Sequence, residues 1–147
     1  MDPADIPALM RAARGSYGHA VTEALIAAGY EDLPRNGPFV IGGMANQGGS
    51  AVDMIRGLGV SRQAASQLID TLVVRGYLAR DVNNEDRRRL DITLTERGRG
   101  AAAVIRGAVE RIGAELASMI TADELAGLRA GLTALANIKQ RNRDAEI

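Results

Sequence analysis

Apolar positions recur with helical spacing in three long stretches of the chain. In residues 6–28 they fall at steps of three and four, which is typical of an amphipathic helix. Thr95 begins a second stretch that runs to about Met119, and Thr121 with Glu124 forms a capping box at the start of a third. The third stretch places leucines at alternating steps, like the seam of a coiled coil. The chain is therefore predicted to be mostly helical.

Two short helices are predicted between the long ones. Their expected N-caps are Ser50 and Ser61, and their expected ends are Gly59 and Gly76. A short turn containing a glycine joins them, which is the spacing of a helix-turn-helix. Residues 39–45 form a further candidate helix, weakened by two adjacent glycines. The helix-turn-helix spacing alone does not separate DNA-binding proteins from helical hairpins that bind nothing.

A β-hairpin is predicted directly after the second short helix. Leu90, Ile92 and Leu94 alternate with polar residues, so one face of the second strand, including Leu90, is expected to be buried. Three arginines stand at the head of this strand. A hairpin beside a helix-turn-helix can reach the minor groove of DNA, whose negative potential attracts arginine. The alternative is that the arginines only solvate a charged turn. They are Arg87, Arg88 and Arg89.

The hairpin and the second short helix carry a recognisable motif. Asp86 and Arg88 are followed after five residues by Leu94 and Thr95, and residues 59–80 match the preceding helix and strand. This chain resembles the multiple-antibiotic-resistance regulator (MarR) family of winged-helix transcription factors. The resemblance implies an α+β, mostly α fold, a winged helix-turn-helix with N- and C-terminal helices forming a dimerisation lobe. One domain is expected, with a DNA-binding lobe over residues 36–95 and a helical lobe from residues 1–35 and 96–147.

The same resemblance implies a sequence-specific DNA-binding transcription regulator, a repressor released by a small-molecule effector, and not an enzyme. Its implied partners are a pseudo-palindromic double-stranded operator, a second copy of the chain, and a small aromatic or anionic effector. Asp86 and Arg88 are expected to pair and brace the wing, while Arg87 lies at its tip. An arginine is common in the family where Gln67 stands, and a glutamine there favours adenine over guanine. The residues expected to contact the major groove are Ser61, Arg62, Gln63, Ala64, Ser66 and Gln67.

Composition narrows the chemistry further. The chain has 18 basic and 18 acidic residues, so any basic surface must be local. It has no cysteine and one histidine, His19, which excludes disulfides and thiolate sites, and no metal or cofactor is expected. The first residues lack a signal-peptide pattern and no apolar run is long enough to span a membrane, so a cytoplasmic protein is expected. Two alternatives stay open, a winged-helix module that binds protein and, less favoured, a small enzyme.

An effector site is the least determined feature of the sequence. Arg11, Tyr17 and His19 lie on the first helix, which in the family helps to line a cleft between the two lobes. An aromatic ring and basic groups there would suit an aromatic acid. The plainer interpretation, which we favour, is that Tyr17 is part of the core and His19 is a solvated surface residue.

Overall fold

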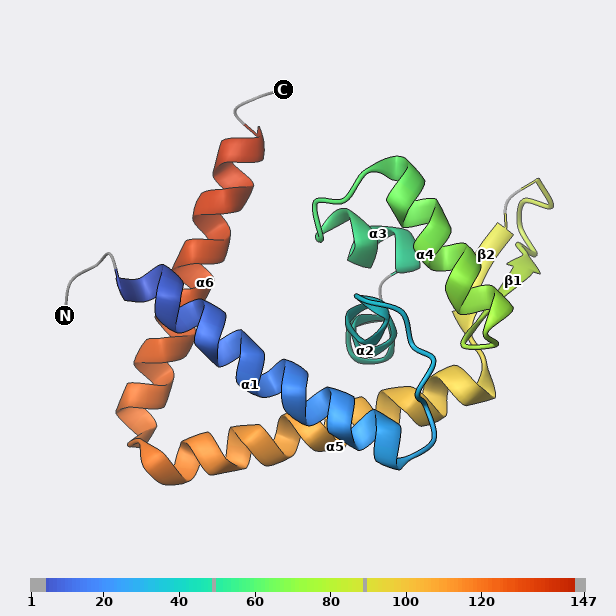
Figure 1. Ribbon diagram of the computed structural model, residues 1–147. Helices are drawn as coiled ribbons and strands as arrows, with labels where there is room; N and C mark the ends of the chain where they lie inside the picture. The colour runs from blue at the N-terminus through green and yellow to red at the C-terminus, as the bar shows by residue number, and fades with distance from the viewer. Residues whose placement is uncertain (1–4, 49, 89, 145–147) are drawn as a thin grey trace. The chain divides into compact units, whose positions relative to one another are not determined.

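The computed structural model describes residues 5–48, 50–88 and 90–144, and side-chain exposure as far as residue 138. In these ranges the chain is mostly helical with one antiparallel pair of strands (Figure 1), which confirms the predicted fold class. The elements are α1 (Ile6–Ala27), α2 (Gly37–Gln47), α3 (Ala51–Arg56), α4 (Arg62–Val74), β1 (Leu78–Val82), β2 (Leu90–Leu94), α5 (Glu96–Met119) and α6 (Ala122–Asp144).

The chain divides into two compact units within α5. The first ends at Glu110 and the second begins at Arg111. The first contains α1 to α4, both strands and the first part of α5, so the predicted DNA-binding lobe, residues 36–95, falls wholly inside it. The second contains the rest of α5 and α6. The predicted division into a DNA-binding and a dimerisation lobe remains a prediction.

Four predicted helix caps are confirmed, because each capping side chain accepts a hydrogen bond from an amide of the following helix. The Ser50 hydroxyl accepts from the Asp53 amide at 3.1 Å. The Thr121–Glu124 capping box is complete, because the Glu124 carboxylate also accepts from the Thr121 amide at 2.8 Å. The Ser61 and Thr95 hydroxyls accept from the amides three residues on, at 3.1 and 3.0 Å.

The core of the first unit brings together residues from all of its helices and from β1. Tyr77, directly before β1, is fully buried, although its hydroxyl is polar. The other members are mostly small or branched aliphatic side chains, as expected for a chain in which aromatic residues make up 3%. The core residues are Val21, Leu25, Val40, Ile41, Ala51, Ile55, Ile69, Leu72, Tyr77, Leu78, Ala101, Ala102, Ile105 and Ala108.

The glycine pair of α2 is where two other helices approach it. A Cβ on Gly43 would lie 2.4 Å from the Met54 sulfur of α3, and one on Gly42 would lie 3.4 Å from Ile105 of α5. The same glycines make residues 39–45 a poor helix by propensity. Packing against α3 and α5 therefore outweighs the local preference, and the helix is longer than predicted.

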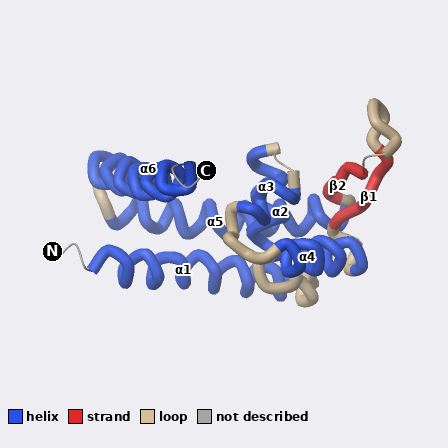
Figure 2. Tube along the Cα trace, turned by 90° about the horizontal axis from the view of Figure 1, so that it is seen from above, coloured by secondary structure: helices blue, strands red, loops and turns tan. Residues whose placement is uncertain are grey.

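The hairpin corrects one expectation about burial. β1 and β2 lie side by side (Figure 2) and pair in antiparallel register, and Leu78 stands opposite Leu94 and Val82 opposite Leu90. Leu94 and Ile92 are half-buried against the core, but Leu90 is 57% exposed. The prediction that Leu90 is buried was therefore wrong. The alternation of apolar and polar residues in β2 predicts the correct face of the strand. The hairpin, however, extends beyond the core, so the end of this face at Leu90 is exposed.

Candidate nucleic-acid interface

The N-terminal end of α4 presents a run of exposed side chains. The turn that leads into α4 contains Gly59, whose φ of 68° lies in the left-handed region that glycine adopts without strain. The Ser61 cap then fixes the first turn, while Ile69 and Leu72 on the other side of α4 are buried. Every residue predicted to face the major groove is exposed: Ser61, Arg62, Gln63, Ala64, Ser66 and Gln67.

The hairpin turn is organised around the Asn83 side chain. Its Oδ1 accepts hydrogen bonds from the amides of Glu85 and Asp86, at 2.8 and 2.9 Å. Its Nδ2 donates to Asp91 Oδ2 at 2.8 Å. An asparagine side chain that accepts from amides two and three residues on replaces the backbone bonds of a turn, so this turn is ordered without a proline.

Arg87 and Arg88 are exposed on this turn, and Arg89 lies outside the described residues. Asp86 was expected to brace the wing through the side chain of Arg88. Instead its Oδ1 accepts a hydrogen bond from the Arg88 backbone amide at 3.0 Å. The ion pairs found in the described ranges do not include an Asp86–Arg88 side-chain pair. The contact from Asp86 therefore runs to the backbone of Arg88.

An ion pair connects the hairpin to α4. Arg80 Nη2 of β1 meets Asp70 Oδ1 of α4, with both side chains more than a third exposed. A pair this exposed contributes little to stability. It links one face of the hairpin to α4, and the hairpin turn and the exposed end of α4 lie in the same compact unit.

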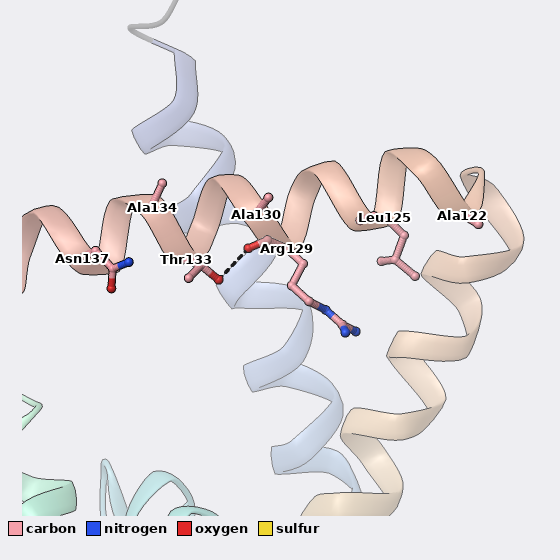
Figure 3. A pocket seen from close by; sticks show the side chains of 8 residues that line it. Ala122, Leu125, Arg129, Ala130, Thr133, Ala134 and Asn137 are labelled. Carbon is pink, nitrogen blue, oxygen red and sulfur yellow. Dashed lines mark hydrogen bonds between the residues drawn. The ribbon is translucent and has the colours of Figure 1, made fainter.

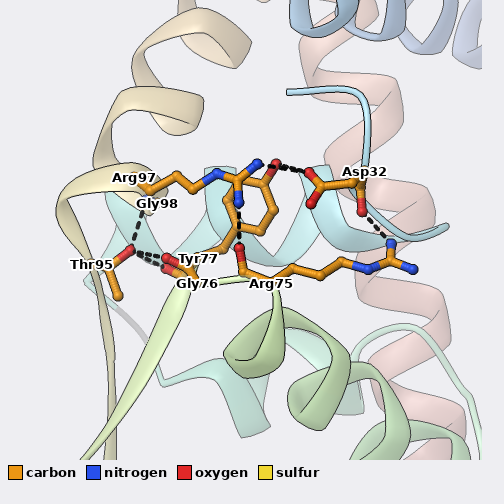
Figure 4. A network of polar contacts seen from close by, with 7 residues as sticks. All are labelled: Asp32, Arg75, Gly76, Tyr77, Thr95, Arg97 and Gly98. Carbon is orange, nitrogen blue, oxygen red and sulfur yellow. Dashed lines mark hydrogen bonds and ion pairs between the residues drawn. The ribbon is translucent and has the colours of Figure 1, made fainter. Parts of the chain in front are cut away.

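A polar junction at the C-terminal end of α4 connects three segments of the first compact unit (Figure 4). The Tyr77 hydroxyl donates to Asp32 Oδ1, and Arg97 Nη2 lies 3.0 Å from the same oxygen. The Arg97 guanidinium also donates to the Arg75 carbonyl at 2.6 Å and stacks 4.4 Å from the centre of the Tyr77 ring. Arg75 in turn donates to the Asp32 carbonyl. The junction therefore joins the α1–α2 loop, the end of α4 and the start of α5.

The junction shifts the titration of two of its members. The hydrogen bond from Tyr77, assisted by the charge of Arg97 and opposed by partial burial, lowers the pKa of Asp32. Burial, followed by the bond to the Asp32 carboxylate, raises the pKa of Tyr77 to about 12. Sequence reasoning missed Asp32, Tyr77 and Arg97. One signal among them was that Tyr77 lies within residues 59–80, the stretch that resembles the family's helix and strand.

The three residues predicted for an effector site are not brought together. Arg11 and His19 are exposed and Tyr17 is half-buried. At about 100° per residue Tyr17 points away from both Arg11 and His19, and those two are separated by about two turns of α1. His19 Nε2 lies 3.3 Å from Glu23 Oε1, one helical turn away. The effector site therefore stays a prediction.

A shallow hollow runs along one side of α6 (Figure 3). Leu125, Arg129 and several alanines line it, and the Thr133 hydroxyl donates to the Arg129 carbonyl at 2.8 Å. The hollow is formed by one helix alone, so it is an uncovered helix face and not an enclosed ligand cavity.

The described ranges contain no group of three His, Asp or Glu side chains placed to hold a metal ion. None of their helices combines the length and apolar character needed to cross a membrane.

Comparison with known proteins gives a consistent result. The model of the MarR family matches residues 40–89. FabT of Streptococcus pneumoniae, solved in complex with DNA, is 18% identical with a TM-score of 0.74, over 95% of this chain and 99% of that one. Apo MarR of E. coli is 23% identical with a TM-score of 0.62, over 92% and 97%. A MepR variant of S. aureus bound to an oligodeoxyribonucleotide is 19% identical with a TM-score of 0.55, over 90% and 96%. No curated protein gives a significant sequence match.

Proposed function

We propose that the protein is a DNA-binding transcription regulator, because residues 40–89 match the model of the MarR family and the chain has the fold of solved MarR-family regulators. The observation that carries the proposal is the exposed N-terminal end of α4, from Ser61 to Gln67, in the same compact unit as a hairpin turn that exposes Arg87 and Arg88. MarR-family regulators are generally not enzymes, so we propose no reaction.

Helix α4 supplies the chemistry of base reading. A capped helix that exposes its first two turns can enter the major groove, where the side-chain amides of Gln63 and Gln67 can each make two hydrogen bonds to the exposed edge of an adenine. Ser61 and Ser66 add hydroxyls suited to phosphate or base contacts, and Arg62 adds charge. The hairpin supplies Arg87 and Arg88 for the minor groove, whose potential attracts guanidinium groups.

The operator is proposed to be pseudo-palindromic, because a two-fold dimer would present two copies of α4 about one helical turn of DNA apart. The proposed homodimer is supported by an apolar seam that α6 leaves exposed. Its members are Leu128, Leu132, Leu135 and Ile138, which are 44, 44, 40 and 51% exposed. Repression, and release by a small aromatic or anionic molecule, are proposed at the level of the family.

A gel shift with the DNA upstream of the protein's own gene tests the function. We expect a retarded complex that competitor DNA of scrambled sequence does not remove. Its affinity should fall steeply between 50 and 200 mM salt, since binding to phosphates releases counterions. Failure to bind this DNA or any enriched duplex at low salt would contradict the proposal and favour a protein-binding module.

Replacing Arg87 with alanine is expected to weaken binding to every duplex tested. The salt dependence should fall by about one counterion per wing, or about two for a dimer, because a minor-groove arginine adds charge with little base specificity. Arg106→Ala is the matched control, since Arg106 is an exposed arginine on α5 outside the proposed interface. Equal slopes for the wild type and Arg87→Ala would show that the hairpin tip does not reach DNA.

A further inference from the structure

The two faces of the β1–β2 hairpin differ in chemistry. Alternate residues of a strand share a face, so the register places Leu78 with Leu94, Arg80 with Ile92 and Val82 with Leu90 on one side. Leu78 is buried, and Arg80 on this side pairs with Asp70 of α4. This inner face is therefore apolar and basic, and it is turned towards the proposed recognition helix.

The outer face is acidic. Asp81 stands directly opposite Asp91, an arrangement of like charges that costs stability in a strand pair. Hydrogen bonds offset part of this cost, since the Thr93 hydroxyl donates to Asp81 and Asn83 donates to Asp91, each at 2.8 Å. Two carboxylates on this side would be repelled by a phosphate backbone, so only the inner face is compatible with DNA.

The inner face ends in an exposed apolar pair. Val82 and Leu90 form the last pair of the register and are 56 and 57% exposed. Val82 also lines a shallow hollow at the tip, together with Asn83, Asn84 and Arg87. An apolar surface beside a guanidinium and two amides matches a deoxyribose wall, which is apolar along its C–H surface and carries phosphates at its rim.

We propose that Val82 and Leu90 pack against the sugar wall of the minor groove and seat the hairpin there, while Arg87 reaches into the groove beside them. The inference rests on the proposed function and adds an apolar contact to it. Apolar side chains recur in minor-groove recognition because they take sugar and base surface out of water. A second copy of the chain is a poorer occupant of this surface. Two half-exposed side chains offer far less area than the roughly 800 Å² that each partner buries in a stable interface.

Val82→Thr and Leu90→Thr test the proposal. Threonine keeps the branched shape and the strand preference of valine, so the hairpin is retained and mainly its apolar surface is reduced. Removing this contact should weaken binding about fivefold per wing, or about 25-fold for a dimer with two wings. The salt dependence should stay unchanged, because an apolar contact releases no counterions. The control is Val74→Thr, because Val74 is 86% exposed at the far end of α4.

Each possible result of these binding measurements either supports the proposed contact or overturns it. Weaker binding with an unchanged salt slope, absent in Val74→Thr, supports the contact. Unchanged affinity in both hairpin variants overturns it, and so does a joint fall of affinity and slope, which would mean that the pair only positions Arg87. A change in sedimentation without DNA would assign the pair to a second copy and also overturn it. If the wild type binds no duplex, the proposed function fails together with this inference, whereas unchanged variants of a binding wild type remove the inference alone.

Discussion

Replacing Gly98 with alanine is expected to lower the free energy of unfolding by roughly 3 kcal/mol or more. A Cβ at this position would stand 2.2 Å from the Tyr77 carbonyl oxygen and 3.0 Å from a Leu94 methyl group. The carbonyl cannot move aside freely, because it accepts hydrogen bonds from the Thr95 amide and hydroxyl, both at 3.1 Å. The start of α5 would have to move away from the base of the hairpin.

Gly107→Ala is the matched control, because it lies on the same helix and a Cβ there would meet nothing within 4 Å. It should raise stability by up to about 1 kcal/mol, since alanine is the better helix former. Urea unfolding of both variants at one protein concentration measures the difference, as the stability of an oligomer depends on concentration. Small and equal effects of the two substitutions would contradict the close approach at Gly98.

Local signals were enough to predict the elements and their order. Ser50, Ser61, Thr95 and Thr121 each cap a helix as expected, because a capping hydroxyl needs only amides two or three residues away. The hairpin was predicted from its alternation and turn residues for the same reason. The exposure of the residues at the start of α4 could also be predicted from the sequence, because the apolar residues that become buried, such as Ile69 and Leu72, lie on the other side of the helix.

Contacts between distant segments could not be predicted in this way. Asp32 and Tyr77 are 45 positions apart, and no spacing rule joins them. The exposure of Leu90 depends on where the core ends. The alternation of apolar and polar residues along a strand predicts which face is buried, but it does not predict how far the core extends along that face. Gly43 weakens the local helix preference of α2, and only the packing of Met54 against it explains why the helix forms there.

Replacing Tyr77 with phenylalanine is expected to remove part of the loss of stability at alkaline pH. The pKa of Tyr77 is raised from 10.0 to about 12, so the folded state holds the hydroxyl proton more tightly than the unfolded chain does. The stabilisation is therefore complete below pH about 10 and is lost as the pH rises towards 12. A shift of this size corresponds to roughly 3 kcal/mol, as an order of magnitude.

At neutral pH Tyr77→Phe should cost only about 1–2 kcal/mol, because Asp32 is partly exposed and keeps Arg97 as a partner. The alkaline limb of its stability profile should then be flatter than that of the wild type. Asp32→Asn should instead change the stability at acidic pH. The pKa of Asp32 is lowered in the folded protein, so its contribution is present above about 3.8 and is lost as the pH falls through the folded value.

Urea unfolding from pH 3 to 11.5 checks both limbs, with Tyr17→Phe as the control because Tyr17 lies on α1 outside the junction. The Tyr77 and Asp32 effects share one hydrogen bond, so the double variant should lose less than the sum of the two single variants. Parallel profiles for the wild type and Tyr77→Phe above pH 10 would mean that the buried hydroxyl does not control the alkaline stability. Additive losses in the double variant would mean that Asp32 and Tyr77 act independently, with Arg97 alone joining the α1–α2 loop to the start of α5.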